Sequence, residues 1–170
     1  MHLYREMISK GIRPQAITYS TLFSGLFSVG KIGDAHKLFV EMQDIDVAPN
    51  PYIFTTFIDG LCKNDCVLDA LEFFLNLENC KLKLTLENFN CLIDGLCKSG
   101  RIEMAWEIFH RLAQEGIVPN VITYSIMING LCKKKELEKA HDLFSNMEEK
   151  GCNPNVITFN TLIAWFHPKQ

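Results

Sequence analysis

The segment Gly130-Leu131-Cys132-Lys133 decides the fold, because similar segments precede it at a constant spacing. The Gly-Leu pair recurs every 35 residues, at positions 25, 60, 95 and 130, and the last three copies continue as Cys-Lys. Alanine keeps the same spacing at positions 35, 70, 105 and 140, as does phenylalanine at positions 39, 74, 109 and 144. A fixed period between about 20 and 50 residues is the signature of a repeat architecture.

Apolar residues within one copy predict two helices. In the last full copy, apolar side chains at positions 124, 127, 128 and 131 follow the i, i+3, i+4, i+7 spacing of one helix face. A second stripe at positions 137, 140, 144 and 147 predicts a second helix. Gly30 and Gly100 supply the break between the two helices, because glycine readily takes the left-handed conformation that ends a helix.

A single helix pair of this size cannot bury its own apolar face, so neighbouring pairs must stack. We therefore predict an all-α fold, a right-handed α-solenoid of antiparallel helix pairs, in one array over residues 1–170. Four full repeats are expected at 16–50, 51–85, 86–120 and 121–155. Residues 1–15 are interpreted as the tail of a preceding repeat, and residues 156–170 as the start of a further one.

Composition limits the possible functions. The 17 Lys and Arg are outnumbered by 20 Asp and Glu, which gives a formal charge of −3. A general polyanion-binding surface is therefore not expected, and any contact with nucleic acid must be local. No apolar run approaches the roughly 18 residues of a membrane span. Residues 1–7 lack the apolar core of a signal peptide and the Arg-rich character of a transit segment, so we expect neither in this chain.

The sequence offers no recognisable catalytic or metal-binding pattern. Its seven cysteines are odd in number and contain no C-x-x-C pair, which disfavours a disulfide framework or a zinc ribbon and favours a reducing compartment. Cys62, Cys97 and Cys132 recur every 35 residues and are interpreted as small packing residues. We found no Ser-His-Asp pattern, Gly-rich phosphate loop or paired carboxylates. We expect a protein without enzymatic activity, metal, cofactor or small-molecule substrate.

The copies resemble the pentatricopeptide repeat. The resemblance lies in Val121-Ile122-Thr123-Tyr124-Ser125, the Gly130 segment, and then Ala140, Phe144, Met147, Gly151 and Pro154-Asn155. The uniform 35-residue length is similar to the P-type subclass, and Gly-Leu-Cys-Lys is similar to plant restorer-of-fertility-like members. The resemblance implies an organellar protein, mitochondrial rather than chloroplast, that binds single-stranded RNA with one base to each repeat. Its implied role is RNA processing, stability or translation by occupancy.

The resemblance also implies which residues contact a base. In the family, the fifth and last residues of a repeat read the base. The matching pairs here are Ser20 with Asn50, Thr55 with Thr85, Asn90 with Asn120, and Ser125 with Asn155. Asn160 begins a further pair, and Gln15 ends an earlier one. The implied bases are adenine, a purine, a pyrimidine, adenine and then a pyrimidine.

Two further sets of residues are predicted to contact RNA. The resemblance places the second residue of each repeat against the face of a base, and these residues are Ile17, Tyr52, Glu87, Ile122 and Ile157. The Glu87 carboxylate does not suit that place, which puts normal binding by the third repeat in doubt. Lysines at the ends of the first helices are predicted phosphate contacts, and these are Lys63, Lys98 and Lys133.

Other interpretations of the same residues stay open. Asparagine before a helix is a favoured N-cap without any ligand. Lysine at a helix C-terminus is stabilised by the helix dipole. The alternative function is a helical-repeat scaffold that binds a protein or peptide in its concave groove, and the net charge of −3 slightly favours it. An RNA-cleaving or deaminating enzyme is disfavoured, because the H-x-E and P-C-x-x-C signature of zinc deaminases is absent.

Overall fold

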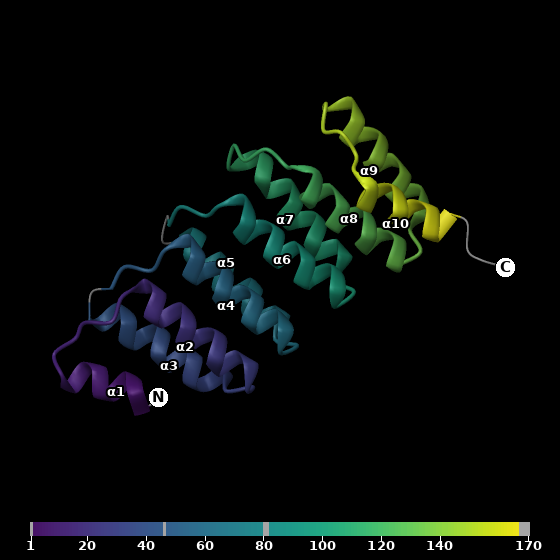
Figure 1. Ribbon diagram of the computed structural model, residues 1–170. Coiled ribbons are helices and arrows are strands. Elements are labelled where there is room, and N and C mark those ends of the chain that lie inside the picture. Colours follow the sequence, from purple (N-terminus) through teal and green to yellow (C-terminus); the bar gives the residue numbers. More distant parts are fainter. Residues whose placement is uncertain (1, 46, 80–81, 167–170) are drawn as a thin grey trace. The chain divides into compact units, whose positions relative to one another are not determined.

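The computed structural model describes residues 2–45, 47–79 and 82–166, and every regular element in this part of the chain is a helix (Figure 1). The prediction of an all-α, helical-repeat fold is confirmed. The chain divides into two compact units, Met1–Leu84 and Thr85–Gln170. None of the helices in these described ranges is long and apolar enough to cross a membrane.

Within residues 2–45, 47–79 and 82–84, the first unit has five helices. They are α1 (His2–Ser9), α2 (Ala16–Ser28), α3 (Ile32–Asp44), α4 (Pro51–Lys63) and α5 (Val67–Asn79). Helix α2 packs against α3 and α4, and α4 packs against α5. Helix α1 joins them through Tyr4, whose hydroxyl donates to Glu41 Oε1 at 2.8 Å and lies 3.1 Å from the Tyr19 hydroxyl. Burial, followed by the bonds to Tyr19 and Glu41, raises the pKa of Tyr4 above its ordinary value.

Aromatic side chains form the core of the first unit. The ring of Phe57, on α4, lies 5.3 Å from Phe23 on α2 and 5.2 Å from Phe39 on α3. It also stacks on Phe73 of α5 at 4.6 Å. Such pairs contribute about 0.5–1.5 kcal/mol each beyond the burial of their area. Phe57 thus joins the helices of two successive repeats around one ring.

The described part of the second unit, up to residue 166, also has five helices. They are α6 (Leu86–Lys98), α7 (Ile102–Gln114), α8 (Val121–Lys133), α9 (Leu137–Glu149) and α10 (Val156–Phe166). Helix α6 packs against α7 and α8, and α8 packs against α9 and α10. The helices that open the successive copies, α2, α4, α6, α8 and α10, therefore begin 35 residues apart.

Turns between the paired helices use a left-handed residue in all four copies. Gly30 and Gly100 take φ of 70° and 75°, as their sequence predicts. The equivalent residues in the other two copies are Asp65 and Lys135, which take φ of 59° and 64°. These two copies therefore keep the same turn geometry without glycine. A residue with a Cβ atom takes the left-handed conformation at a steric cost that glycine does not have.

Cysteines in this fold act as packing residues. Cys97 and Cys132 are buried, and burial raises the pKa of the Cys97 thiol to about 12 and also raises that of Cys132. Both thiols are therefore neutral at physiological pH, a state that is poorly nucleophilic. This agrees with the interpretation of Cys97 and Cys132 as small packing residues, whereas Cys62 is half-buried.

Candidate functional site

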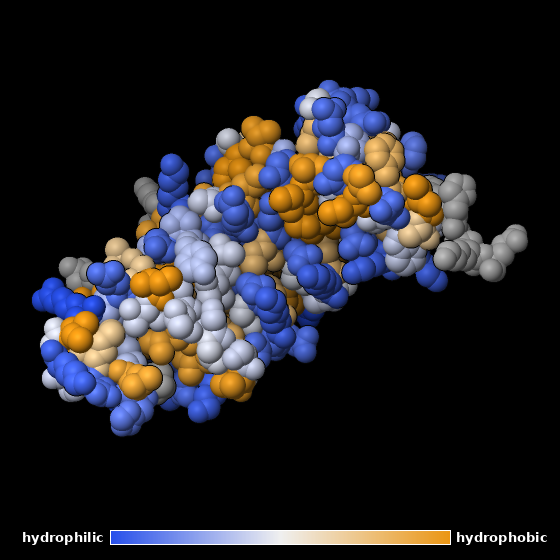
Figure 2. All heavy atoms as spheres, viewed as in Figure 1, coloured by the Kyte–Doolittle hydropathy of each residue, from blue (hydrophilic) through white to orange (hydrophobic). Residues whose placement is uncertain are grey.

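Large apolar side chains are exposed at the second residue of four copies. The exposed fraction is 64% for Ile17 and 63% for Tyr52 in the first unit. It is 56% for Ile122 and 66% for Ile157 in the second. Single exposed apolar residues are common on protein surfaces, and apolar side chains are visible among polar ones in Figure 2. Recurrence at one place in each repeat is a stronger signal, because it gives each unit an apolar contact point at the start of successive helices.

Glu87 occupies the same place in the remaining copy and is exposed. Its own backbone N–H, followed by the Thr85 hydroxyl, holds the pKa of the Glu87 carboxyl below its ordinary value. The side chain is therefore a carboxylate at neutral pH. The third repeat presents a negative charge where the other copies present an apolar surface.

The last residues of three repeats are asparagines that cap the next helix. Asn50 Oδ1 accepts from the Ile53 N–H at 3.0 Å. Asn120 Oδ1 accepts from the N–H groups of Ile122 and Thr123 at 3.0 and 3.1 Å. The capping interpretation of Asn50 and Asn120 is confirmed. Because the carboxamide oxygen faces the helix, the two N–H donors of the same amide are left for a ligand.

The other two predicted last residues differ. Gln15 is exposed, and its backbone N–H donates to Thr18 Oγ1 at 3.3 Å. Thr85 is half-buried, and its hydroxyl donates to Asn88 Oδ1 at 3.2 Å. Thr85 lies in the second unit, whereas its predicted partner Thr55 lies in the first.

The fifth residues of the repeats have varied environments. Ser20 is 3% exposed, and its hydroxyl donates to the Ala16 carbonyl at 3.0 Å. The Thr55 hydroxyl donates to the Pro51 carbonyl at 3.1 Å. Asn160, on α10, is exposed.

Asn90, the fifth residue of the third repeat, has an unsatisfied polar atom. Its Oδ1 is shielded from solvent and has no hydrogen-bond partner among the described residues. A buried acceptor without a donor costs about 1–3 kcal/mol.

The lysines at the ends of the first helices carry different partners. Lys63 Nζ lies 2.6 Å from Asp59 Oδ2, and Lys98 Nζ lies 2.5 Å from Asp94 Oδ2. Lys133 has Asn129 four residues before it, so the equivalent ion pair is not possible there. Exposed pairs of this kind contribute about 0.2–1 kcal/mol, so a phosphate group can displace the aspartate.

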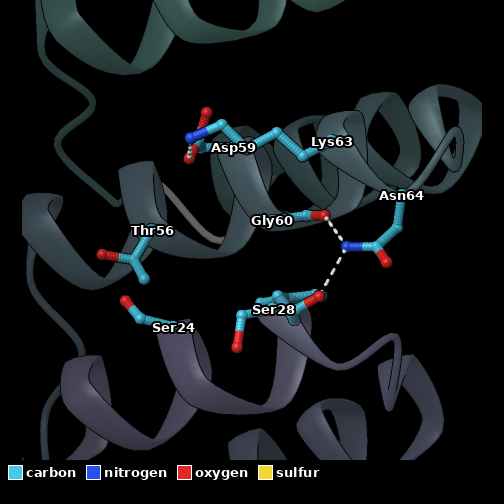
Figure 3. Close-up of a pocket in the computed structure, with 8 residues that line it drawn as sticks. Ser24, Ser28, Thr56, Asp59, Gly60, Lys63 and Asn64 are labelled. Carbon is cyan, nitrogen blue, oxygen red and sulfur yellow. Dashed lines mark hydrogen bonds and ion pairs between the residues drawn. The ribbon is translucent and has the colours of Figure 1, made fainter.

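A hydrophilic cavity of about 400 Å³ lies between α2 and α4 in the first unit. Figure 3 shows Ser24 and Ser28 on one side and Thr56, Asp59 and Lys63 on the other. Asn64 closes one end, where its Nδ2 donates to the carbonyls of Phe27 and Gly60 at 3.0 and 2.8 Å. The cavity places the predicted phosphate contact Lys63 beside hydroxyl groups from the preceding repeat.

Buried polar residues at the third position of three copies were missed by the sequence interpretation. Asn88, Thr123 and Thr158 are each fully buried, although they are polar. Thr123 and Thr158 bond to the asparagine three residues earlier, and Asn88 bonds to Thr85 in the same way. A polar residue three positions after a predicted N-cap is the sequence signal of a capping box, and it could have identified them.

Comparison with known families decides the family of this chain. The model described as the PPR repeat family matches residues 16–63, 86–133 and 127–167, and the PPR repeat model matches residues 52–82. The chain belongs to the PPR repeat family. Its recurrent first-helix residues are therefore the corresponding residues of successive PPR repeats, and the family prediction made from the sequence is confirmed.

Solved structures share the fold. The crystal structure of the maize PPR protein PPR10 has a TM-score of 0.84 and 18% identity, over 96% of this chain and 23% of that one. PPR10 in complex with an 18-nt psaJ RNA element has a TM-score of 0.81 and 18% identity, over 96% and 24%. The PPR domain of Arabidopsis thaliana protein-only RNase P 1 in complex with tRNA has a TM-score of 0.75 and 17% identity, over 97% and 87%. No curated protein sequence matches.

Proposed function

We propose that this chain is a sequence-preferring RNA-binding module that takes single-stranded RNA with one base to each repeat. The observation that carries the proposal is the recurrence, in both units, of an exposed apolar residue next to a capping asparagine with free N–H donors. The fold supports it, because PPR10 and the RNase P 1 domain with this fold were solved in complex with RNA. This chain spans 23% of the PPR10 chain, so the role of a whole protein belongs to the proposal as well.

The chemistry of each repeat follows from three contacts. An aliphatic or aromatic second residue packs on the face of a base, an interaction worth about 1–3 kcal/mol for an aromatic side chain. The fifth and last residues offer donors and acceptors to the base edge. Lysine at the end of the first helix neutralises a phosphate. All three contacts are non-covalent. The proposed module therefore acts by occupying the RNA, and it neither forms nor breaks covalent bonds in it.

The proposal extends to the order of the bases and to the cellular setting. The base order from the pairs is adenine, a purine, a pyrimidine, adenine and a pyrimidine. The proposed setting is RNA processing, stability or translation in a plant organelle, with the mitochondrion favoured over the chloroplast by the resemblance to restorer-like members. Targeting of the complete protein to isolated organelles would test the setting, and localisation outside both organelles would contradict it.

A second candidate, a scaffold for a protein or peptide, has support from apolar cavities on the second helices of the repeats. One of about 460 Å³ is lined by Trp106, Phe109 and His110 of α7 together with residues of α9. One of about 390 Å³ is lined in the first unit by α3 and α5 residues that include His36 and Phe39. These lie two repeats apart at matching positions. Binding of a peptide that persists when the RNA contacts are mutated would favour this function.

The ion pairs of the lysines make a prediction about RNA affinity. Asp59→Asn and Asp94→Asn should each increase affinity for RNA about 1.4- to 5-fold at low salt, because the lysine is released from an ion pair worth about 0.2–1 kcal/mol that competes with phosphate. Fluorescence anisotropy with a labelled RNA measures this. Lys133→Ala should weaken binding more than Lys63→Ala, since Lys133 has no such competitor. Equal losses, with no gain in the aspartate variants, would contradict phosphate contact by these lysines.

A further inference from the structure

The cavity between α2 and α4 in the first unit presents mainly hydrogen-bond acceptors. It has a volume of about 400 Å³, and hydroxyl groups from Ser24, Ser28 and Thr56 contribute to its lining (Figure 3). A hydroxyl group can donate one proton and can also accept, so the class of ligand that fits depends on where each proton points.

Two of these hydroxyl groups have already used their protons. Ser28 Oγ donates to the Gly25 carbonyl at 2.9 Å, and Thr56 Oγ1 donates to the Tyr52 carbonyl at 2.9 Å. A carbonyl oxygen only accepts, so the direction of both bonds is fixed, and the two hydroxyl oxygens keep their lone pairs. Ser28 and Thr56 therefore offer acceptors to a ligand.

The other polar groups of the cavity add further acceptors. Asn64 uses both of its amide N–H groups on backbone carbonyls, at 3.0 and 2.8 Å, which leaves its Oδ1. The Asp59 carboxylate only accepts. Donors come from the Ser24 hydroxyl and from Lys63, which is paired with Asp59 at 2.6 Å. Acceptors therefore outnumber donors in the cavity.

This balance suits a ribose hydroxyl better than a phosphate alone. Phosphate oxygens only accept, so Lys63 can hold a phosphate, but the oxygens of Ser28 and Thr56 cannot bond to it. The ribose 2′-OH both donates and accepts, and it lies next to a phosphate along the RNA strand. DNA has no hydroxyl group at this position, so the same contact would distinguish the two nucleic acids.

The cavity lies on the same face of α4 as a predicted base contact. Thr56, Asp59 and Lys63 follow Tyr52 at the i+4, i+7 and i+11 spacing of one helix face. Tyr52 is 63% exposed and is the second residue of its repeat. A strand whose base packs on Tyr52 can therefore place its sugar and phosphate along this face.

The helix pair α6–α8 of the second unit does not carry the same groups. Asp94, Lys98 and Ile126 stand where the α2–α4 pair has its three hydroxyl groups. Asp94 and Lys98 form an ion pair with each other, and Ile126 offers no polar atom in its side chain. Recognition of the sugar by hydroxyl acceptors is therefore expected at the α2–α4 pair and not at the α6–α8 pair.

We infer that the α2–α4 cavity binds a ribose 2′-OH, with the oxygens of Ser28 and Thr56 as its acceptors. The inference rests on the proposed RNA-binding function and deepens it. It makes the first two repeats the place where this chain distinguishes RNA from DNA by the sugar.

The test is fluorescence anisotropy of the full chain with a labelled RNA, A-G-C-A, in which one nucleotide at a time carries 2′-fluoro in place of the 2′-OH. A fluorine atom cannot donate a hydrogen bond, and it keeps the sugar pucker of ribose. One substitution, at the first or the second nucleotide, should weaken binding about 3- to 10-fold, as expected for the loss of one hydrogen bond. The same change at the third nucleotide should weaken binding less than about 2-fold.

Variants of the cavity connect this effect to its acceptors. Ser28→Ala combined with Thr56→Val should lower the ratio of affinities for 2′-OH over 2′-fluoro RNA, at the sensitive nucleotide, to about one. Affinity for the 2′-fluoro RNA should stay the same. Thr56→Ser alone keeps the acceptor and should preserve the ratio.

Thr21→Val is the matched control. Thr21 stands at the place of Thr56 in the preceding copy, and its hydroxyl donates to the Ile17 carbonyl at 2.9 Å in the same way. It does not contribute to the lining of the cavity. This variant should leave the ratio at the sensitive nucleotide unchanged.

Three results would overturn the inference while RNA binding itself remained. The first is an RNA affinity that no 2′-fluoro substitution at the first or second nucleotide changes. The second is an unchanged ratio in the double variant, and the third is an equal fall of the ratio in Thr21→Val. Failure of the wild type to bind any of these RNAs is a distinct outcome, because it would overturn the proposed function and this inference with it.

Discussion

Gly60→Ala is expected to destabilise the first unit by about 1–3 kcal/mol, because overpacking a close contact typically costs this much. A Cβ atom at Gly60 would lie 2.2 Å from Phe27 Cδ2 and 2.3 Å from Cγ of the same ring. Phe27 is buried, so its ring cannot move away without disturbing the packing of α2 against α4. The higher helix propensity of alanine, about 1 kcal/mol, reduces the loss but does not cancel it.

Gly25→Ala is the matched control, since Gly25 occupies the same place in the preceding copy and an added Cβ would have no atom within 4 Å apart from its chain neighbours and the backbone of its own helix. It should leave stability unchanged or raise it by up to about 1 kcal/mol. Thermal unfolding followed by circular dichroism measures both, with a shift of about 2–4 °C for each kcal/mol. An equal effect of the two substitutions would contradict the close contact at Gly60.

Exchange of the side chains at the second position should change RNA affinity in opposite directions. Ile122→Glu is expected to weaken binding about 10-fold or more, because it removes an apolar side chain whose full burial is worth about 1.5–3 kcal/mol and adds a charge near phosphate. Glu87→Ile should strengthen binding by a similar factor. Anisotropy titrations of both variants with the same labelled RNA measure the two effects. Since the pKa of Glu87 is lowered, its charge and therefore its effect should persist from neutral pH down through pH 5.

Val40→Glu is the control for the change in charge. Val40 is 55% exposed and lies on α3, which is a second helix and carries none of the predicted RNA contacts. This variant should lose less than about 2-fold in affinity, because its charge is remote from the strand. If Val40→Glu and Ile122→Glu weakened RNA binding equally, the change in net charge alone would explain the effect. The proposed contact between the second residue of a repeat and the face of a base would then be wrong.

Much of the fold was predictable from the sequence, because residues that pack between helices or end them recur every 35 residues. The recurrence of Gly130 and its equivalents gave the repeat length, and the apolar spacing around Tyr124 gave a helix that the structure places at Val121–Lys133. Turn residues were less predictable. Asp65 and Lys135 take the left-handed conformation of Gly30 and Gly100; aspartate is enriched in this region, whereas lysine gives no such signal.

The residues of the candidate site are a prediction from the family pattern, and the structure adds their hydrogen bonds, which the sequence did not predict. The family pattern named Ser20 and Ser125 as equivalent, and sequence alone gives no reason to separate them. Their hydroxyls find different partners because the next helix brings Ile53 to one and Thr158 to the other. The competing Asp59 was also not foreseen, since an i,i+4 ion pair on the same helix depends on which rotamer the lysine adopts.

The most direct test of RNA binding with ordered base preference is fluorescence anisotropy of this chain with the RNA A-G-C-A, a scrambled RNA of the same bases, and the matching DNA, at two salt concentrations. We predict tighter binding to the ordered RNA than to either alternative. The log–log salt slope should be roughly −2, as expected for about three phosphate contacts on a single strand. Equal affinity for all three oligonucleotides, a salt slope near zero, or the absence of binding would each contradict the account.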